Sequence, residues 1–320
     1  MRPYMTLVFA GACLLAPQAG GQVYPVRPIK LVIPFAPNGG ADITGRLFAE
    51  RLGGILKQQV TVENRPGEGG ATATAAVSRA APDGYTLLHV TTATFVTTPI
   101  FSRTPSYDPL SSFVPVTLLS SMAAVIVVNP SLPARTLQEL TALVKASPGR
   151  YRYATAGSGS LSFLAGELFK SQTQLDVKEV QAKGPIAAAQ SVASGGADMM
   201  FDLAVFFVPG AREGKLRPLA TMASGRIPQF SEVPSTTEAG MPDLIAYSWS
   251  GLVAPFGTPP ETVDVINRAA QAVLAEIETQ ATFQRYGLVA EGSSPGEFHR
   301  IIRAELTKWA RALPLSATSQ

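Results

Sequence analysis

The residues with the clearest capacity for chemistry lie in the stretch Leu31–Asp42, LVIPFAPNGGAD. Its apolar start predicts a short buried strand, which ends at prolines and turns on Gly39 and Gly40 before a helix that begins at Asp42. A glycine turn that opens a helix leaves backbone N–H groups unpaired at the positive end of the helix dipole, where they can bind an anion. The alternative is an ordinary strand-to-helix turn in which Asp42 caps the helix.

Similar glycine turns recur along the chain. NRPGEGG (64–70) and GSGS (157–160) each precede a predicted helix, and Lys183-Gly184-Pro185 precedes another. Four hydroxyl side chains accompany these turns: Thr94, Thr155, Ser158 and Ser160. Neutral amides and hydroxyls can hold a carboxylate without reacting with it. This set of groups therefore favours a binding site over a catalytic one.

The side chains that catalysis would need are scarce. The chain has only two histidines, His89 and His299, and we interpret both as structural; His89, within a predicted strand near the ligand edge, is the closer to the glycine turns. Ser162 stands where a dinucleotide fingerprint needs its third glycine, and neither a Walker lysine nor a G-x-S-x-G elbow occurs. Three aspartates are predicted to cap helices, order loops or accept hydrogen bonds from a ligand: Asp42, Asp198 and Asp202. We expect no enzyme activity, no metal and no cofactor.

Composition narrows the class of protein further. A chain of 320 residues predicts about two domains. The formal charge of +3 is scattered, without a basic cluster carrying aromatic residues, so nucleic acid is excluded as a partner. No apolar run after residue 25 reaches the roughly 18 residues of a membrane span.

The first residues predict a secretory signal. Arg2 is followed by the apolar run Leu7–Ala16 and by the small residues Ala19-Gly20-Gly21. We therefore exclude residues 1–21 from the fold and expect an exported, periplasmic protein. A lipoprotein would need cleavage just before Cys13, after a stunted apolar core, and we favour the secretory interpretation. Cys13 is the single cysteine, so the mature chain would hold neither a disulfide nor a thiolate.

Two α/β blocks are predicted to position the glycine turns. Strands are predicted at 31–33, 60–63 and 85–90. They alternate with a helix that begins at 42 and with a helix over 71–81. The apolar stripe of the first helix is Ile43, Leu47, Leu52 and Ile55. A second block starts at Ala123, with strands at 124–128, 151–156, 177–181, 198–202 and 216–222 and helices at 137–146, 162–171, 186–194 and 205–213. Residues 223–260 are predicted to return the chain to the first domain, where amphipathic helices 262–281 and 295–313 pack. Ligands bind such sheets at the carboxyl ends of the strands.

The ordered series of motifs resembles the Bug family, the solute receptors of tripartite tricarboxylate transporters. PFAPNGGAD (34–42) is similar to the first ligand loop of that family. ENRPGEGG (63–70), APDGYTLL (81–88), YATAGSGS…LAGELF (153–169), KG (183–184), GGADMMFD (195–202), GKLRPLA (214–220), VPSTTEAGMP (233–242) and APFGTPPE (254–261) follow in the family's order. The resemblance spans essentially the whole mature chain.

The resemblance implies a fold, a function and a site. The fold would be a two-lobed α/β periplasmic-binding-protein fold (Venus flytrap, type II-like) with open mixed sheets flanked by helices. Its domains would comprise residues 22–122 with 245–320, and 123–244, with the ligand cleft between them. A monomer would capture a small carboxylate, an organic acid or an amino acid, and deliver it to membrane permease subunits. The resemblance implies these ligand-binding residues: Phe35, Asn38, Gly39, Gly40, Asp42, Ala156, Gly157, Ser158, Ser160, Gly184, Pro185 and Asp202. Asp202 would face the distal end of the ligand. We add Thr94 because of its position after the third strand.

Three departures from the family pattern bear on the ligand. Asn38 extends the first loop, Phe163 replaces a frequent histidine, and Ala182 replaces a tyrosine before Lys183. Phe163 is alternatively a core residue of its helix. Two other functions stay open at this point: a receptor that signals to a membrane sensor kinase, and an exported enzyme that uses the same cleft.

Overall fold

The structure, a computed structural model, describes residues 24–102 and 104–313. The predicted signal peptide (1–21), including Cys13, lies outside the described residues. Within the described part of the chain, no helix is long and apolar enough to cross a membrane.

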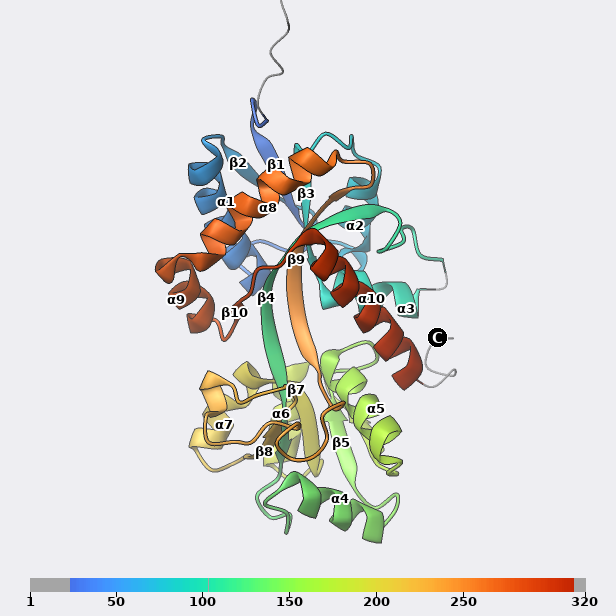
Figure 1. The fold of residues 1–320 in the computed structure, drawn as a ribbon. Coiled ribbons are helices and arrows are strands. Elements are labelled where there is room, and N and C mark those ends of the chain that lie inside the picture. Colours follow the sequence, from blue (N-terminus) through green and yellow to red (C-terminus); the bar gives the residue numbers. More distant parts are fainter. Residues whose placement is uncertain (1–23, 103, 314–320) are drawn as a thin grey trace, which may run out of the picture.

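The chain forms two lobes, stacked one above the other in Figure 1. The upper lobe joins the first part of the chain to its last part. Its elements are β1 (Ile29–Ile33), α1 (Gly40–Leu56), β2 (Val60–Asn64), η1 (Glu68–Gly70), α2 (Ala71–Ser78), β3 (Thr86–Thr91), η2 (Ala93–Thr97), α3 (Thr98–Phe101), α8 (Pro260–Ala275), α9 (Ile277–Arg285), β10 (Val289–Ala290) and α10 (Pro295–Ala312).

The lower lobe is built from the middle of the chain. Its elements are α4 (Leu137–Ala146), β5 (Arg152–Thr155), α5 (Leu161–Thr173), β6 (Lys178–Gln181), α6 (Pro185–Ala193), β7 (Met199–Leu203), η3 (Ala204–Phe206), α7 (Val208–Arg212), β8 (Arg217–Thr221) and η4 (Pro228–Phe230). Strands β5, β6 and β7 are parallel, so their carboxyl ends meet at one edge of the sheet, where the loops before α5 and α6 begin.

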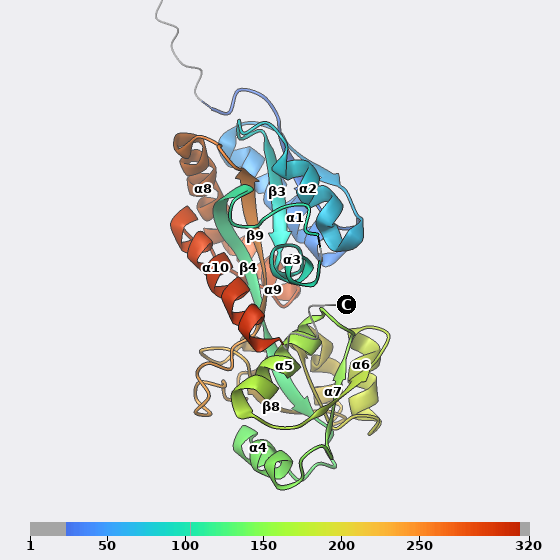
Figure 2. The ribbon, with the colours of Figure 1, turned by 90° about the vertical axis from the view of Figure 1, so that its right-hand side faces the viewer.

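Two long antiparallel strands, β4 (Phe113–Val128) and β9 (Tyr247–Pro255), run between the lobes (Figures 1 and 2). β4 pairs with β9 from Phe113 to Ala123, then with β7 and β8 from Ala124 to Val128. The strands consequently follow one another in the order β2-β1-β3-β9-β4-β7-β5-β6. The predicted start of β4 at Ala124 was wrong, and β9 was not among the predicted strands. Serine, threonine and proline interrupt the apolar pattern of both strands, and cross-strand pairing stabilises them instead.

Two other helix predictions needed correction. The predicted stripe of α1 was wrong at both ends, because Ile43 and Ile55 are 36% and 40% exposed. The buried face instead carries Gly45, Phe48, Ala49 and Leu52, and a Cβ at Gly45 would lie 2.5 Å from Ile33 Cδ1, so the missing side chain lets α1 approach β1 closely. The single helix predicted over 262–281 is two helices, α8 and α9, because Glu276 is extended.

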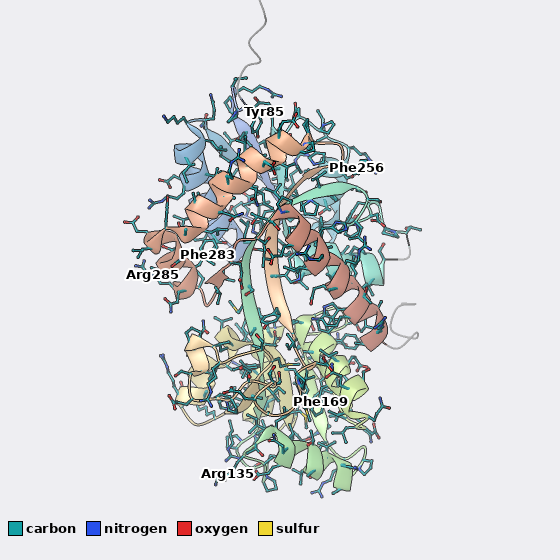
Figure 3. All side chains as sticks on the ribbon, viewed as in Figure 1. Tyr85, Arg135, Phe169, Phe256, Phe283 and Arg285 are labelled. Carbon is teal, nitrogen blue, oxygen red and sulfur yellow. The ribbon has the colours of Figure 1, made fainter. Side chains whose placement is uncertain are left out.

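Hydrophobic cores lie on both faces of the upper sheet. One packs α1, α8 and α9 against the sheet and includes Phe283, labelled in Figure 3. The other lies under α2 and α10 and continues into the lower lobe, where Phe169 packs against Phe201 with ring centroids 5.0 Å apart. The two lobes therefore share one apolar core across β4 and β9.

Gly251 of β9 tests how tightly α10 packs on the crossing strands. A Cβ at Gly251 would overlap the ring of Phe298, so Gly251→Ala should lower the free energy of unfolding by about 1–3 kcal/mol. Gly54→Ala is the control: Gly54 lies in α1 with no atom within 4 Å of its added Cβ, and the exchange should stabilise by about 1 kcal/mol. Urea unfolding measures both, and equal effects would contradict the packing.

Candidate functional site

The first glycine turn ends in unpaired amides. Gly39 is the N-cap of α1, with φ −80° and ψ 167°, and the helix begins at Gly40. The prediction of a start and cap at Asp42 was therefore wrong by two to three residues. Among the described residues, the first amide of this helix with a protein acceptor is that of Ile43, which donates to Gly39 O at 3.0 Å. The amides of Gly39, Gly40 and Ala41 remain available to a ligand.

Asp42 holds the turn in shape. Its buried carboxylate accepts hydrogen bonds from Asn38 N at 2.9 Å, Arg46 Nε at 3.0 Å and Asn64 Nδ2 at 2.8 Å. Asn38 has φ 67°, a left-handed conformation that the bond from its amide helps to hold. Burial alone would raise the pKa of Asp42, but the hydrogen bonds from Arg46, Asn38 and Asn64 outweigh it and the pKa is lowered. Phe35 is half-buried, and its carbonyl accepts from Asn64 Nδ2 at 3.1 Å.

The loops after β1, β2 and β3 meet beside this turn. Gly70 has φ 94°, and a Cβ there would lie 2.5 Å from Thr94 Cγ2 and 3.1 Å from Pro34 Cβ. Thr94 is fully buried, and its hydroxyl donates to Thr91 O at 3.2 Å and accepts from Thr91 N at 3.0 Å. Its carbonyl accepts a short hydrogen bond from the Tyr107 hydroxyl. Thr94 therefore contacts and connects these loops.

In the lower lobe, the loop before α5 is ordered by its own hydroxyls. Ser160 is the N-cap: its Oγ accepts from Phe163 N at 3.2 Å and donates to Gly157 O at 2.6 Å. The amide of Ala156 donates to Ser162 Oγ at 2.9 Å, and that of Gly157, with φ 109°, donates to Thr155 Oγ1 at 3.2 Å. Ser158 is exposed. Its hydroxyl and amide have no partner among the described residues.

The third glycine turn lies beside the serine loop. Thr155 and Gln181 are partners in the parallel β5–β6 pair, and a Cβ at Gly157 would lie 2.6 Å from Gln181 Nε2. Gly184, with φ 94°, is the N-cap of α6, and Pro185 is its first residue. Ala182 is half-buried and its amide donates to Thr155 O at 2.8 Å. The prediction that these two turns share a sheet edge is consistent with this register.

Asp202 lies under the serine loop. It is 4% exposed on β7, and the β5–β7 register, extended by two residues, brings it beside Ala156. Its Oδ1 accepts from Leu203 N at 2.7 Å. Burial raises the pKa of Asp202 to about 6, although hydrogen bonds from Leu203 N and Ser162 act to lower it. It is a weakly hydrated carboxyl next to the loop, not a partner for a second carboxylate.

The upper lobe meets the lower lobe through Thr97 and Phe101, which the sequence motifs did not indicate. A Cβ at Gly159 would lie 3.1 Å from Thr97 Cγ2 and near Phe101. The rings of Phe101 and Phe163 pack at 6.2 Å, which supports the interpretation of Phe163 as a core residue. In Figure 2, α1 and α3 of the upper lobe face α5 and α6 of the lower. The upper and lower loop clusters thus occupy opposing edges, joined at α3. Nothing in the types of Thr97 and Phe101 signals this contact.

The chemistry available at these edges is hydrogen bonding to an anion. Amides at the starts of α1, α5 and α6 carry partial positive charge. The described residues contain no group of three or more His, Cys, Asp or Glu side chains that could hold a metal.

The raised pKa of Asp202 gives a pH-dependent prediction. Because the folded-state pKa of about 6 lies above the ordinary 3.8, folding favours the protonated carboxyl, and this stabilisation is lost as pH rises from 3.8 through 6. Asp202→Asn should therefore raise the free energy of unfolding at pH 7.5 by on the order of 3 kcal/mol and change it little at pH 4. Urea unfolding of both proteins between pH 4 and 8 measures the difference. A difference that does not vary with pH would contradict it.

Comparison with known proteins fits this geometry. Residues 44–314 match the family described as "Tripartite tricarboxylate transporter family receptor". Protein BugT of Bordetella pertussis is 32% identical over 95% of this chain and 93% of its own. A TctC solute-binding protein from Polaromonas, solved without ligand, is 28% identical with a TM-score of 0.83, over 90% and 98% of the chains. An R. palustris protein solved with adipate is 30% identical with a TM-score of 0.71, over 92% and 98%.

These matches confirm the resemblance to the Bug family and the predicted fold class. The chain belongs to the tripartite tricarboxylate transporter receptor family of periplasmic solute-binding proteins.

Proposed function

We propose that this protein captures a small carboxylate between its lobes and delivers it to the membrane permease of a tripartite tricarboxylate-type transporter. One observation carries the proposal: the helices α1, α5 and α6 all begin, at glycine or serine turns, on the lobe edges that face each other. Helix N-termini stabilise an anion through unpaired N–H groups and the helix dipole. Adipate, the ligand of one structural relative, is a carboxylate.

The contacts divide the proposed site residues into two roles. Gly39, Gly40 and Ser158 keep free donors and would touch the carboxylate. The turn at Gly184 and Pro185 would aim the start of α6 at the ligand without donating itself, since the Gly184 amide donates to Ala182 O at 3.0 Å and Pro185 has no N–H. The others would position these donors, because their own polar groups are already engaged or they shape the turns: Phe35, Asn38, Asp42, Thr94, Ala156, Gly157 and Ser160. Asp202 would lie toward the ligand's distal end.

Closure would occur about the crossing strands. We assign residues 22–122 with 245–320 to one moving domain and 123–244 to the other. This division is supported by the pairing of β4, which changes from β9 to β7 and β8 at Ala123 and Ala124. Hinge closure around a ligand is the usual motion of periplasmic receptors.

A thermal-shift screen of the mature protein tests the function. The panel holds mono-, di- and tricarboxylates, aromatic acids and amino acids. A ligand at a hundred times its dissociation constant should add about 2.7 kcal/mol of stability, which raises the melting midpoint. Amides matched to each acid serve as controls, since they lack the charge. Equal shifts with acids and amides, or none with any acid, would refute the proposal.

Gly39→Val separates binding from folding. Gly39 is extended, and an added Cβ would meet Ala36 O at an ordinary 3.6 Å, so the fold should accept valine. The branched side chain would nevertheless crowd the free amides, and we expect at least a tenfold loss of carboxylate affinity, about 1.4 kcal/mol. Isothermal titration measures the affinity and urea unfolding the stability, with Gly54→Ala as a control far along the same helix. Unchanged affinity would remove the first turn from the site.

A further inference from the structure

A cavity of about 230 Å³ adjoins the start of α1 on the upper sheet. Gly40 and Ala41, whose amides are free, line it together with strands β3, β4 and β9. Its walls include Met122, Trp249, Leu288 and Tyr286, which is 40% exposed at the surface. The cavity is larger than the roughly 150 Å³ that can hold a benzene molecule.

Among the residues that the structure describes, no charged side chain lines this cavity. Its polar side chains are hydroxyl-bearing residues, His89 and the indole of Trp249, and Ser120 and Ser250 satisfy each other with their Oγ atoms 2.8 Å apart. A second carboxylate would lose its hydration here without gaining a cation. The cavity therefore favours an uncharged part of a ligand.

Two buried polar atoms of the residues that line the cavity lack a partner among the described residues, His89 Nδ1 and Trp249 Nε1. An indole N–H can only donate, whereas the ring of His89 can donate to a ligand hydroxyl or accept from it. His89 is 2% exposed and shares the face of β3 with Leu87. Burial lowers the pKa of His89 to about 4, so the ring is neutral at pH 7. A neutral imidazole can donate a hydrogen bond to a hydroxyl or accept one from it. An unpartnered buried donor or acceptor is costly unless a ligand or water reaches it.

We propose that this cavity binds the tail of the ligand and selects an aromatic monocarboxylate that carries a hydroxyl group. This rests on the proposed function, since the carboxylate would lie on the amides of Gly40 and Ala41 and the ring would extend into the cavity. Met122 and Tyr286 would contact the ring. His89 would bond the hydroxyl and so acts as a specificity-determining residue.

Isothermal titration with 4-hydroxybenzoate, benzoate and adipate tests this. Wild-type protein should bind 4-hydroxybenzoate at least tenfold more tightly than either of the others. His89→Leu should abolish the tighter binding of 4-hydroxybenzoate relative to benzoate, while the affinity for benzoate stays within about twofold of the wild-type value. His299→Leu, at a half-buried position on α10, is the matched control and should preserve the tighter binding of 4-hydroxybenzoate.

Tyr286→Ala provides a second test, because this side chain lies at the surface and its loss should not affect folding. The substitution should lower the affinity for both aromatic acids at least threefold and leave the affinity for adipate unchanged. Two outcomes would overturn this inference and leave the proposed function intact. One is that adipate binds as tightly as 4-hydroxybenzoate or more tightly. The other is that His89→Leu lowers the affinity for both aromatic acids equally. Failure of every carboxylate to bind wild-type protein would overturn the proposed function and this inference with it.

Discussion

Unpaired backbone amides at the starts of three helices are the constraint around which this molecule is arranged. A helix always leaves its first N–H groups without an internal partner, and they need water, a side chain or an anion. Here the sequence supplies glycine at the first and third turns and a serine cap at the second, so that only part of the demand is met within the chain. Parallel strands then bring these turns to a common edge in each lobe.

The surrounding polar residues keep those amides in place. Asp42 joins the turn to α1 and β2, and Thr94 joins the loops after β1, β2 and β3. The polar atoms of both residues are engaged within the protein, which is why we assign them to support the site. In the lower lobe, the hydroxyls of Thr155, Ser160 and Ser162 hold the serine loop in place through hydrogen bonds to its backbone.

Sequence reasoning identified the glycine turns, the alternation of strands and helices and the family, because each depends on local residue types. It could not identify β9 or the first eleven residues of β4, since their stability comes from pairing between distant segments. The stripe of α1 was misread because Gly45, an apparently weak helix residue, marks the contact with β1. The cavity beside His89 could not be predicted for the same reason: its walls come from five separate parts of the chain.

The place of β9 in the chain also governs how the protein can reach this structure. The amide of Trp249 in β9 donates to Thr92 Oγ1, 157 residues earlier. As the chain is synthesised, β3 and the long β4 are finished well before their shared neighbour exists, so both have open edges that can pair with other chains. Contacts between such distant segments also slow folding. A chain with this order of strands therefore cannot complete its central sheet until late in its synthesis.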